Sequence, residues 1–167
     1  MGKKCYIGID PGATGALAII FEDGKIEVFD YPGDERELMA QMKRYAVQLD
    51  PISVVIEVQQ SMPLQGVVSA FKLGGNYYSW LTAIAAVDWP VTLVRPAEWK
   101  SNMGYPAKVA GQNATARKKV SKAYSVTMAR RLYPHAGEFL TLVKHHDRAE
   151  AILLAHYAGR RSDKWLE

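Results

Sequence analysis

Ile7-Gly8-Ile9-Asp10-Pro11-Gly12 is an apolar segment that ends on a carboxylate and turns at once, and it decides the fold. A second apolar segment, at 53–58, carries Glu57 directly after three β-branched residues. Asp10 alone has an ordinary explanation, because aspartate before proline is common in turns. Glu57 is harder to satisfy, since an unpaired negative charge among apolar neighbours is costly. Both segments therefore predict strands that end beside a cation.

The elements between and beyond these two strands predict an α/β fold with a mixed five-stranded sheet. Strands are expected at 5–9, 16–21, 26–29, 53–58 and 90–94, and helices at 34–50, 66–86, 114–133 and 146–160. The Asp23-Gly24 pair is a strong hairpin signal, so the first three strands should be antiparallel. The helix at 34–50 makes a crossover that sets the strand at 53–58 parallel to the first. A break is expected at 61–63 and irregular structure at 96–111.

The last predicted helix carries a second pair of acids. Asp147 and Glu150 are three residues apart, so they share one face of this helix. The same face continues into Ala151, Leu154 and Ala158, which would pack on the sheet. Asp147 also suits a helix start, where the dipole favours negative charge. That explanation does not extend to Glu150, which is surrounded by apolar residues.

The carboxyl ends of parallel neighbouring strands meet at one edge of a sheet, where ligands of α/β proteins bind. We expect this edge to collect Asp10, Glu57, Asp147 and Glu150. Oxygen ligands without a cysteine or histidine cage are typical of a hard divalent cation such as Mg²⁺. Two ions would relieve the repulsion among four carboxylates, and such pairs stabilise the attacking and leaving oxygens of a phosphodiester.

The composition fits one domain over residues 1–167. Hydrophobic residues make up 49% of the 167 residues, which is enough for a single core. Cys5 is the single cysteine, which excludes an internal disulfide and favours a reducing compartment. The N-terminus lacks an apolar signal region, and no stretch is long and apolar enough to span a bilayer. We therefore expect a cytoplasmic protein that does not bind a membrane.

The net charge of +4 is modest but unevenly distributed. Basic residues dominate from Arg95 to Arg131, where Glu98 alone opposes them. A basic third of the chain beside a carboxylate cluster suits a polyanionic substrate that is processed at a metal. The alternative explanation for such a basic segment is a solvated charged face.

In this order, the motifs resemble the RuvC family of Holliday junction resolvases, within the ribonuclease H-like superfamily. Segments 7–12 and 54–57 look like its two acidic strands, 69–74 matches its junction-facing helix, and 147–151 looks like its last catalytic helix. The resemblance covers nearly the whole chain and implies a single RuvC-like nuclease domain. It implies a homodimer that nicks four-way DNA junctions symmetrically, with two Mg²⁺ or Mn²⁺ ions at the four acids. Three departures from the family pattern fit a phage-like branch in a bacterial or phage-infected cell: Glu150, where many relatives carry aspartate, the uncommon segment 59–63 and the aromatic run 77–80.

The resemblance also assigns roles to basic and aromatic residues. Lys100 and Lys118 are similar in position to family lysines that assist cleavage, with Lys119 as the rival to Lys118. His145 and His146 adjoin the acids, and whether either takes part stays open. The residues expected to contact DNA are Phe71, Lys72, Lys100, Lys108, Arg117, Lys118, Lys119 and Lys122.

Other functions fit parts of this pattern. Residues 10–15 also resemble the phosphate loop of actin-like kinases, but those enzymes need a second lobe of similar size. A DNA-binding module that has lost cleavage would not need all four acids. A related nuclease that acts on flaps, replication forks or RNA–DNA hybrids would use the same chemistry, so the preferred substrate stays open.

Overall fold

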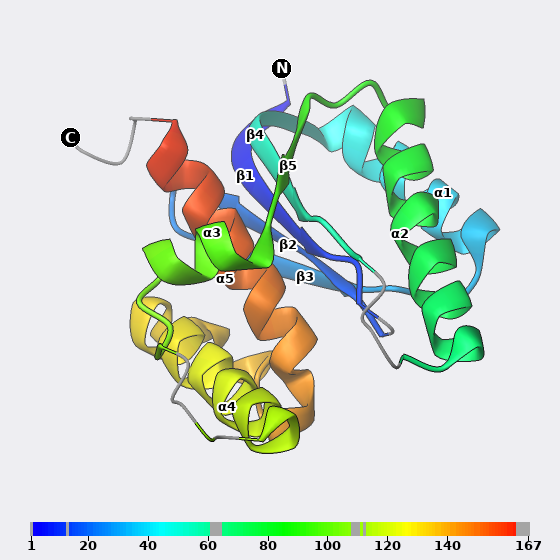
Figure 1. Ribbon diagram of the computed structural model, residues 1–167. Coiled ribbons are helices and arrows are strands. Elements are labelled where there is room, and N and C mark those ends of the chain that lie inside the picture. The colour runs from blue at the N-terminus through cyan, green and yellow to red at the C-terminus, as the bar shows by residue number, and fades with distance from the viewer. Residues whose placement is uncertain (1, 13, 61–64, 108–110, 112, 163–167) are drawn as a thin grey trace.

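A five-stranded mixed sheet forms the centre of the molecule, with the strand order β3-β2-β1-β4-β5 (Figure 1). The computed structural model describes residues 2–12, 14–60, 65–107, 111 and 113–162. The strands are β1 (Lys3–Asp10), β2 (Ala16–Phe21), β3 (Ile26–Asp30), β4 (Leu49–Glu57) and β5 (Val91–Val94). β1, β2 and β3 are antiparallel, whereas β4 runs parallel to β1 and β5 parallel to β4. The predicted α/β class, the antiparallel meander and the crossover are confirmed.

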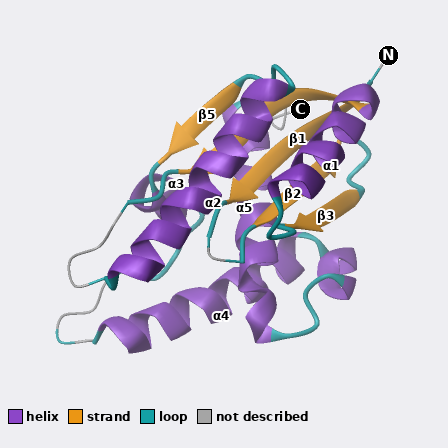
Figure 2. Cartoon of the chain, turned by 90° about the vertical axis from the view of Figure 1, so that its right-hand side faces the viewer, coloured by secondary structure: helices purple, strands orange, loops and turns teal. Residues whose placement is uncertain are grey.

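Helices cover both faces of this sheet. They are α1 (Glu35–Gln48), α2 (Val67–Ala86), α3 (Pro96–Asn102), α4 (Ala114–Leu132) and α5 (His146–Arg161), with short 3-10 turns at η1 (Pro134–Glu138) and η2 (Val143–His145). α1 and α2 pack on the face that carries Cys5, Ile7 and Ile9. α3, α4 and α5 lie over the opposite face (Figures 1 and 2). Of the helices in the described part of the chain, none combines the length and apolar character needed to cross a membrane.

The backbone of α5 approaches β1 very closely at Gly8, in the middle of the strand. A Cβ atom at this position would lie 2.1 Å from the backbone nitrogen of Ala155 and 2.3 Å from the carbonyl oxygen of Ala151. Only a residue without a side chain lets the backbone of α5 rest on the strand. The first turn of α5 is thereby carried to the end of β1, beside Asp10.

The prediction of irregular structure at 96–111 was wrong for residues 96–102, which form the helix α3, whereas residues 103–107 are irregular as expected. Pro96 occupies its first turn, where a fixed φ and a missing N–H are tolerated. Trp99 is fully buried and anchors the helix on the core. A helix of 7 residues is too short to show a hydrophobic repeat, so the sequence pattern could not reveal it.

The start of β4 also differs from the prediction, since the strand begins at Leu49 rather than at 53. The pairing with β1 shifts register where Cys5 faces Pro51 and Tyr6 faces Ser53. Proline cannot donate to a ladder and is found at such irregularities. Pro51 nevertheless stands inside the strand β4. The predicted break at 61–63 lies outside the described residues.

Candidate active site

Two acids from neighbouring strands meet at one edge of the sheet. Ile9 pairs with Ile56 in the parallel register of β1 and β4, so Asp10 and Glu57 are each the next residue along. Both side chains are largely withdrawn from solvent, with 5% of Asp10 and 7% of Glu57 exposed. Two buried carboxylates on adjacent strands need compensating charge, as the sequence predicted.

The first turn of α5 adds the other two acids. Glu150 is buried with 8% exposure, and the side chain of Asp147 is 15% exposed. The negative charges of Glu150, Glu57 and Asp147 all act on Asp10. The structure therefore brings the four predicted acids together, from three segments far apart in the chain.

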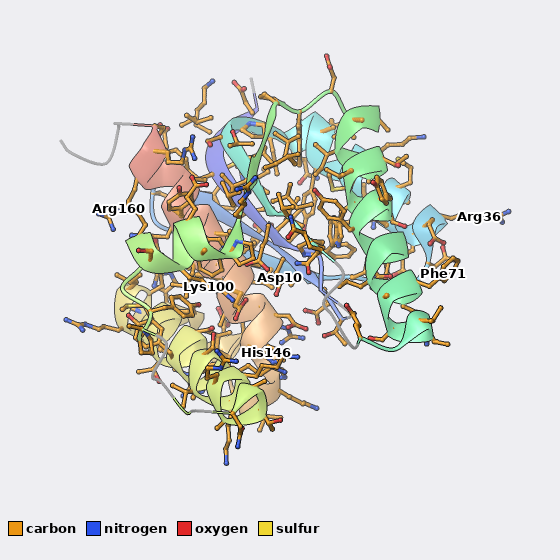
Figure 3. All side chains as sticks on the ribbon, in the orientation of Figure 1. Asp10, Arg36, Phe71, Lys100, His146 and Arg160 are labelled. Atoms are coloured by element: carbon orange, nitrogen blue, oxygen red, sulfur yellow. The ribbon has the colours of Figure 1, made fainter. Side chains whose placement is uncertain are left out.

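Lys100 of α3 enters this cluster as a cation. Its Nζ lies 2.9 Å from Oε2 of Glu150 and 4.0 Å from Oε2 of Glu57. Burial by itself lowers the pKa of Lys100, but the carboxylates of Glu150 and Glu57 outweigh it and raise that pKa. Figure 3 shows Lys100 and Asp10 close together in the middle of the view, and the charge of Asp10 also raises the pKa of Lys100. The ammonium group stands between acids of a strand and a helix.

Glu57 is held by donors on both of its oxygens. Trp99 Nε1 donates to Oε2 at 2.6 Å, and Gln59 Nε2 donates to Oε1 at 3.1 Å. Burial raises the pKa of Glu57, Lys100 opposes that rise, and Glu150 adds to it. Trp99 thus fixes the orientation of a carboxylate whose charged form is otherwise disfavoured.

Glu150 has a comparable support on α4. The hydroxyl of Ser125, which is fully buried, donates to Oε1 of Glu150 at 3.0 Å. The hydroxyl of Tyr105 lies 2.9 Å from Ser125 Oγ and donates to it when Ser125 donates to the acid. Sequence reasoning missed Trp99, Tyr105 and Ser125. A tryptophan directly before Lys100 was the one available signal, whereas nothing in the sequence distinguishes a serine inside a basic helix.

Asp10 carries the strongest electrostatic strain of the site. Burial raises its pKa well above the ordinary value, and Glu150, Glu57 and Asp147 raise it further. The N–H of Gly12 donates to Oδ1 at 3.0 Å and opposes the rise. Lys100 alone does not balance the acids around Asp10, so the site has a capacity for further positive charge.

Each carboxylate oxygen of Asp147 has a polar partner. His146 Nε2 lies 2.7 Å from Oδ1, and the hydroxyl of Thr14 donates to Oδ2. His146 Nδ1 lies 3.1 Å from the carbonyl oxygen of Lys144, so both ring nitrogens face acceptors and a protonated ring satisfies both. The hydrogen bond to Asp147 accordingly raises the pKa of His146. Burial raises the pKa of Asp147, but the bonds from His146 and Thr14 prevail and lower it.

The two histidines that adjoin the acids differ in their surroundings. His145 Nδ1 accepts a hydrogen bond from the backbone N–H of Leu142 at 3.3 Å, and within the described part of the chain His145 bonds to none of the four acids. Partial burial, Arg148 and Lys144 lower the pKa of His145. Of the pair, His146 is the one that touches an acid of the site.

The donor set of this site fits a hard divalent cation. The candidate ligands are oxygens of carboxylates, which Mg²⁺ and Mn²⁺ prefer. The ammonium group of Lys100 already lies between Glu57 and Glu150, in the manner of a bound cation. Within the described residues, no three His, Cys, Asp or Glu side chains are grouped as a ready-made metal cage. A cation at this site would compete with Lys100 for Glu57 and Glu150.

The basic residues predicted to contact DNA lie mostly on exposed helix surfaces. Lys118, Lys119 and Lys122 are exposed on α4 and Arg117 is half-buried there, and none of the four makes an ion pair with a described residue. Lys122 is nonetheless close enough for its charge to lower the pKa of Asp147. Neither Lys118 nor Lys119 contacts one of the acids, so the choice between them stays a prediction.

The remaining residues predicted to contact DNA are Phe71 and Lys72 of α2 and Lys108, which precedes α4 in the sequence. Phe71 is 82% exposed and Lys72 is also exposed, near the N-terminal end of α2. Lys108 lies outside the described residues. The N-terminal ends of α2 and α4 extend beyond the sheet on the side toward which β5 points (Figure 2). That is the side of the four acids, since β4 and β5 are parallel and Glu57 ends β4.

Neither a protein-family model nor a curated protein sequence matches the chain. Solved structures do match it. The structure of Thermus thermophilus RuvC in complex with Holliday junction substrate superposes with a TM-score of 0.59 at 19% identity, over 93% of this chain and 94% of that one. A second Thermus thermophilus RuvC structure gives a TM-score of 0.58 at 21% identity, over 94% and 95% of the two chains. The chain therefore has the fold of RuvC over nearly its whole length, as its motifs predicted.

Proposed function

We propose that this protein is a metal-dependent, structure-selective endodeoxyribonuclease with a ribonuclease H-like fold that resolves four-way DNA junctions by paired, symmetric nicks. The observation that carries the proposal is the convergence of Asp10, Glu57, Asp147 and Glu150 on one sheet edge, around Lys100. The RuvC-like fold supports it, since one of the matching structures holds a Holliday junction substrate.

The four acids would hold two Mg²⁺ ions, for which Mn²⁺ would substitute. When bound, such ions supply Lewis-acid stabilisation of the charge that develops on a phosphate and lower the pKa of water. Asp10 would be the central ligand, because it is the acid on which the charges of the other three converge. The hydrogen bonds from Trp99 and Ser125 keep Glu57 and Glu150 oriented for the same purpose.

Lys100 has two tasks in this proposal. Without metal, its ammonium group offsets the charge of Glu57 and Glu150. With metal in place, those acids would no longer need it, and Lys100 would be free to bind a phosphate oxygen of the substrate. A lysine that is 24% exposed at the rim of the cluster has the freedom for such a change.

The DNA would be bound by two protruding helices. Arg117, Lys118, Lys119 and Lys122 of α4 provide positive charge for phosphates, and Lys72 adds to it from α2. Phe71, exposed beside Lys72, suits stacking on an unpaired base at the junction centre. Cutting two strands symmetrically requires two active sites, so the active form would be a homodimer.

The experiment that tests the proposal is a substrate panel. Four-way, three-way, flap, duplex and RNA–DNA hybrid substrates are each incubated with Mg²⁺, Mn²⁺ or a chelator. We expect paired nicks in the four-way junction, dependent on a divalent ion. The Asp10→Asn variant should bind the junction without cutting it, and retained nicking by this variant would disprove the metal site. Faster cleavage of flaps or hybrids would show that these, and not the four-way junction, are the preferred substrate. A protein mass near 18.6 kDa in the DNA complex, measured by light scattering after the mass of the DNA is subtracted, would exclude the dimer.

A further inference from the structure

The turn between β1 and β2 touches two of the four acids. At its start, the N–H of Gly12 donates to Oδ1 of Asp10 at 3.0 Å. Near its end, the hydroxyl of Thr14 donates to Oδ2 of Asp147 on α5. Asp10 and Asp147 belong to elements at opposite ends of the chain, and this turn links them directly. The position of this turn therefore sets the relative orientation of the Asp10 and Asp147 carboxylates.

Helix α2 holds this turn in place from the other side. Asn76 Nδ2 donates to the carbonyl oxygen of Gly12 at 3.2 Å. Trp80, one helical turn further along the same face, is fully buried against the end of the turn. A Cβ atom at Gly15 would lie 3.3 Å from Trp80 Nε1, which shows how closely the indole and the turn approach. Gly15 has a φ of +44°, so the turn reverses tightly over the indole.

These contacts form a continuous chain from α2 to the acids. Gly12 accepts from Asn76 through its carbonyl oxygen and donates to Asp10 through its N–H, so a shift of the helix contact moves the acid contact as well. Asn76 is half-buried on α2, on the helix that also contributes Tyr77 and Trp80 to the apolar core. Its amide donates across to the turn, 64 residues earlier in the chain, and so links the helix to the segment that follows β1.

We infer that Asn76 and Thr14 are positioning residues, which fix the turn after β1 so that Asp10 and Asp147 present their carboxylates to one divalent ion. The inference rests on the proposed metal-dependent function and adds to it two residues outside the four acids. Outer partners of metal ligands typically change metal affinity about 10- to 100-fold when they are removed.

The test is Mn²⁺ binding by the protein alone, measured by electron paramagnetic resonance of the free ion. Asn76→Leu keeps the volume and removes the donor, and Thr14→Val keeps the shape and removes the hydroxyl. Each variant should bind Mn²⁺ about tenfold more weakly and show a lower kcat at saturating junction DNA, with unchanged junction affinity in chelator. Asn76→Gln, which retains a donor, should recover part of the loss. Thr82→Ala on an exposed part of α2 is the control and should match the wild type.

A double variant tests whether the two residues act through the same turn. If they do, Asn76→Leu combined with Thr14→Val weakens Mn²⁺ binding by less than the product of the single effects. Thr14 is exposed, so its variant carries the test even where Asn76→Leu fails to fold. Wild-type Mn²⁺ affinity in the Thr14→Val variant would overturn the inference, and so would a wild-type protein that binds no Mn²⁺. Weakened Mn²⁺ binding in a protein that cuts no DNA would leave the inference standing and reject the nuclease function.

Discussion

A side chain on Gly8 would collide with the backbone of Ala155, since a Cβ there would lie 2.1 Å from the Ala155 nitrogen. We predict that Gly8→Ala lowers the free energy of unfolding by about 3 kcal/mol or more, because backbone atoms cannot yield as a side chain does. The variant should also lose cleavage, since α5 carries Asp147 and Glu150. Urea denaturation measures the first effect and junction nicking the second.

The control for this variant is Gly74→Ala in α2, where nothing lies within 4 Å of the added Cβ atom. Alanine is favoured over glycine inside a helix by roughly 0.5–1 kcal/mol, so this change should stabilise the protein. Equal effects of the two substitutions would show that α5 does not depend on close contact with β1.

The pH dependence of stability should reveal the raised pKa of Asp10 in the folded protein. Its folded-state pKa is raised by burial and by Glu150, Glu57 and Asp147, so the folded state holds this proton more tightly than the unfolded state does. Stability is therefore lost as the pH rises from about 4, the unfolded pKa, through the folded pKa. Asp10→Asn removes this loss and should raise the Tm of the metal-free protein at neutral pH, by about 2–4 °C for each kcal/mol gained.

The same scan with Mg²⁺ separates metal binding from simple charge removal. Millimolar Mg²⁺ should raise the Tm of the wild type, because it binds the folded state alone. It should have little effect on Asp10→Asn. A Tm for Asp10→Asn below that of the wild type, both without metal, would contradict the repulsion that we describe.

The hydrogen bond from Trp99 to Glu57 can be removed without emptying the core. Trp99→Phe keeps an aromatic ring but leaves a buried carboxylate oxygen without its donor, at 2.6 Å in the native protein. The cost should be about 1–3 kcal/mol of stability, with a loss of Mg²⁺ affinity of about tenfold or more. Calorimetric titration with Mg²⁺ checks the second value. Trp89→Phe, in the core on the other face of the sheet, should leave Mg²⁺ affinity unchanged.

Some exposed lysines of α4 should contribute to DNA affinity alone, whereas one should also contribute to the rate of cleavage. We predict that Lys118→Ala slows turnover at saturating junction DNA, beyond its effect on affinity. Each lost phosphate contact should also flatten the dependence of log K on log salt by about 0.9. Lys119→Ala, measured in parallel, is the matched comparison. If only Lys119→Ala slows turnover, the roles of the two residues are exchanged, and if neither does, both serve as tethers.

The sequence predicted the four acids because each belongs to a local pattern. Asp10 and Glu57 end apolar strands, and Glu150 interrupts the apolar face of a helix, so short-range periodicity was enough to find them. The order of the strands followed from one hairpin and one crossover. In these respects the pattern of the chain and the structure agree.

What supports the acids could not be predicted in the same way. Trp99 and Ser125 reach Glu57 and Glu150 from elements 42 and 25 residues away in the chain, and such pairings depend on how α3 and α4 pack. α3 itself was missed because a single short helix has no repeat to detect. Lys100 was expected near the reaction from the family resemblance, but its place between two acids came from the structure.

The close seat of α5 on β1 also has a consequence for the order in which the protein is made. One acid comes at position 10 and the last at position 150, so a ribosome must synthesise most of the chain before the set exists. Even then the helix must dock over Gly8 before the carboxylates meet. Under the proposed function, the protein would have no cutting centre while it is still a nascent chain, and an unfinished or misfolded copy would not cut the DNA around it.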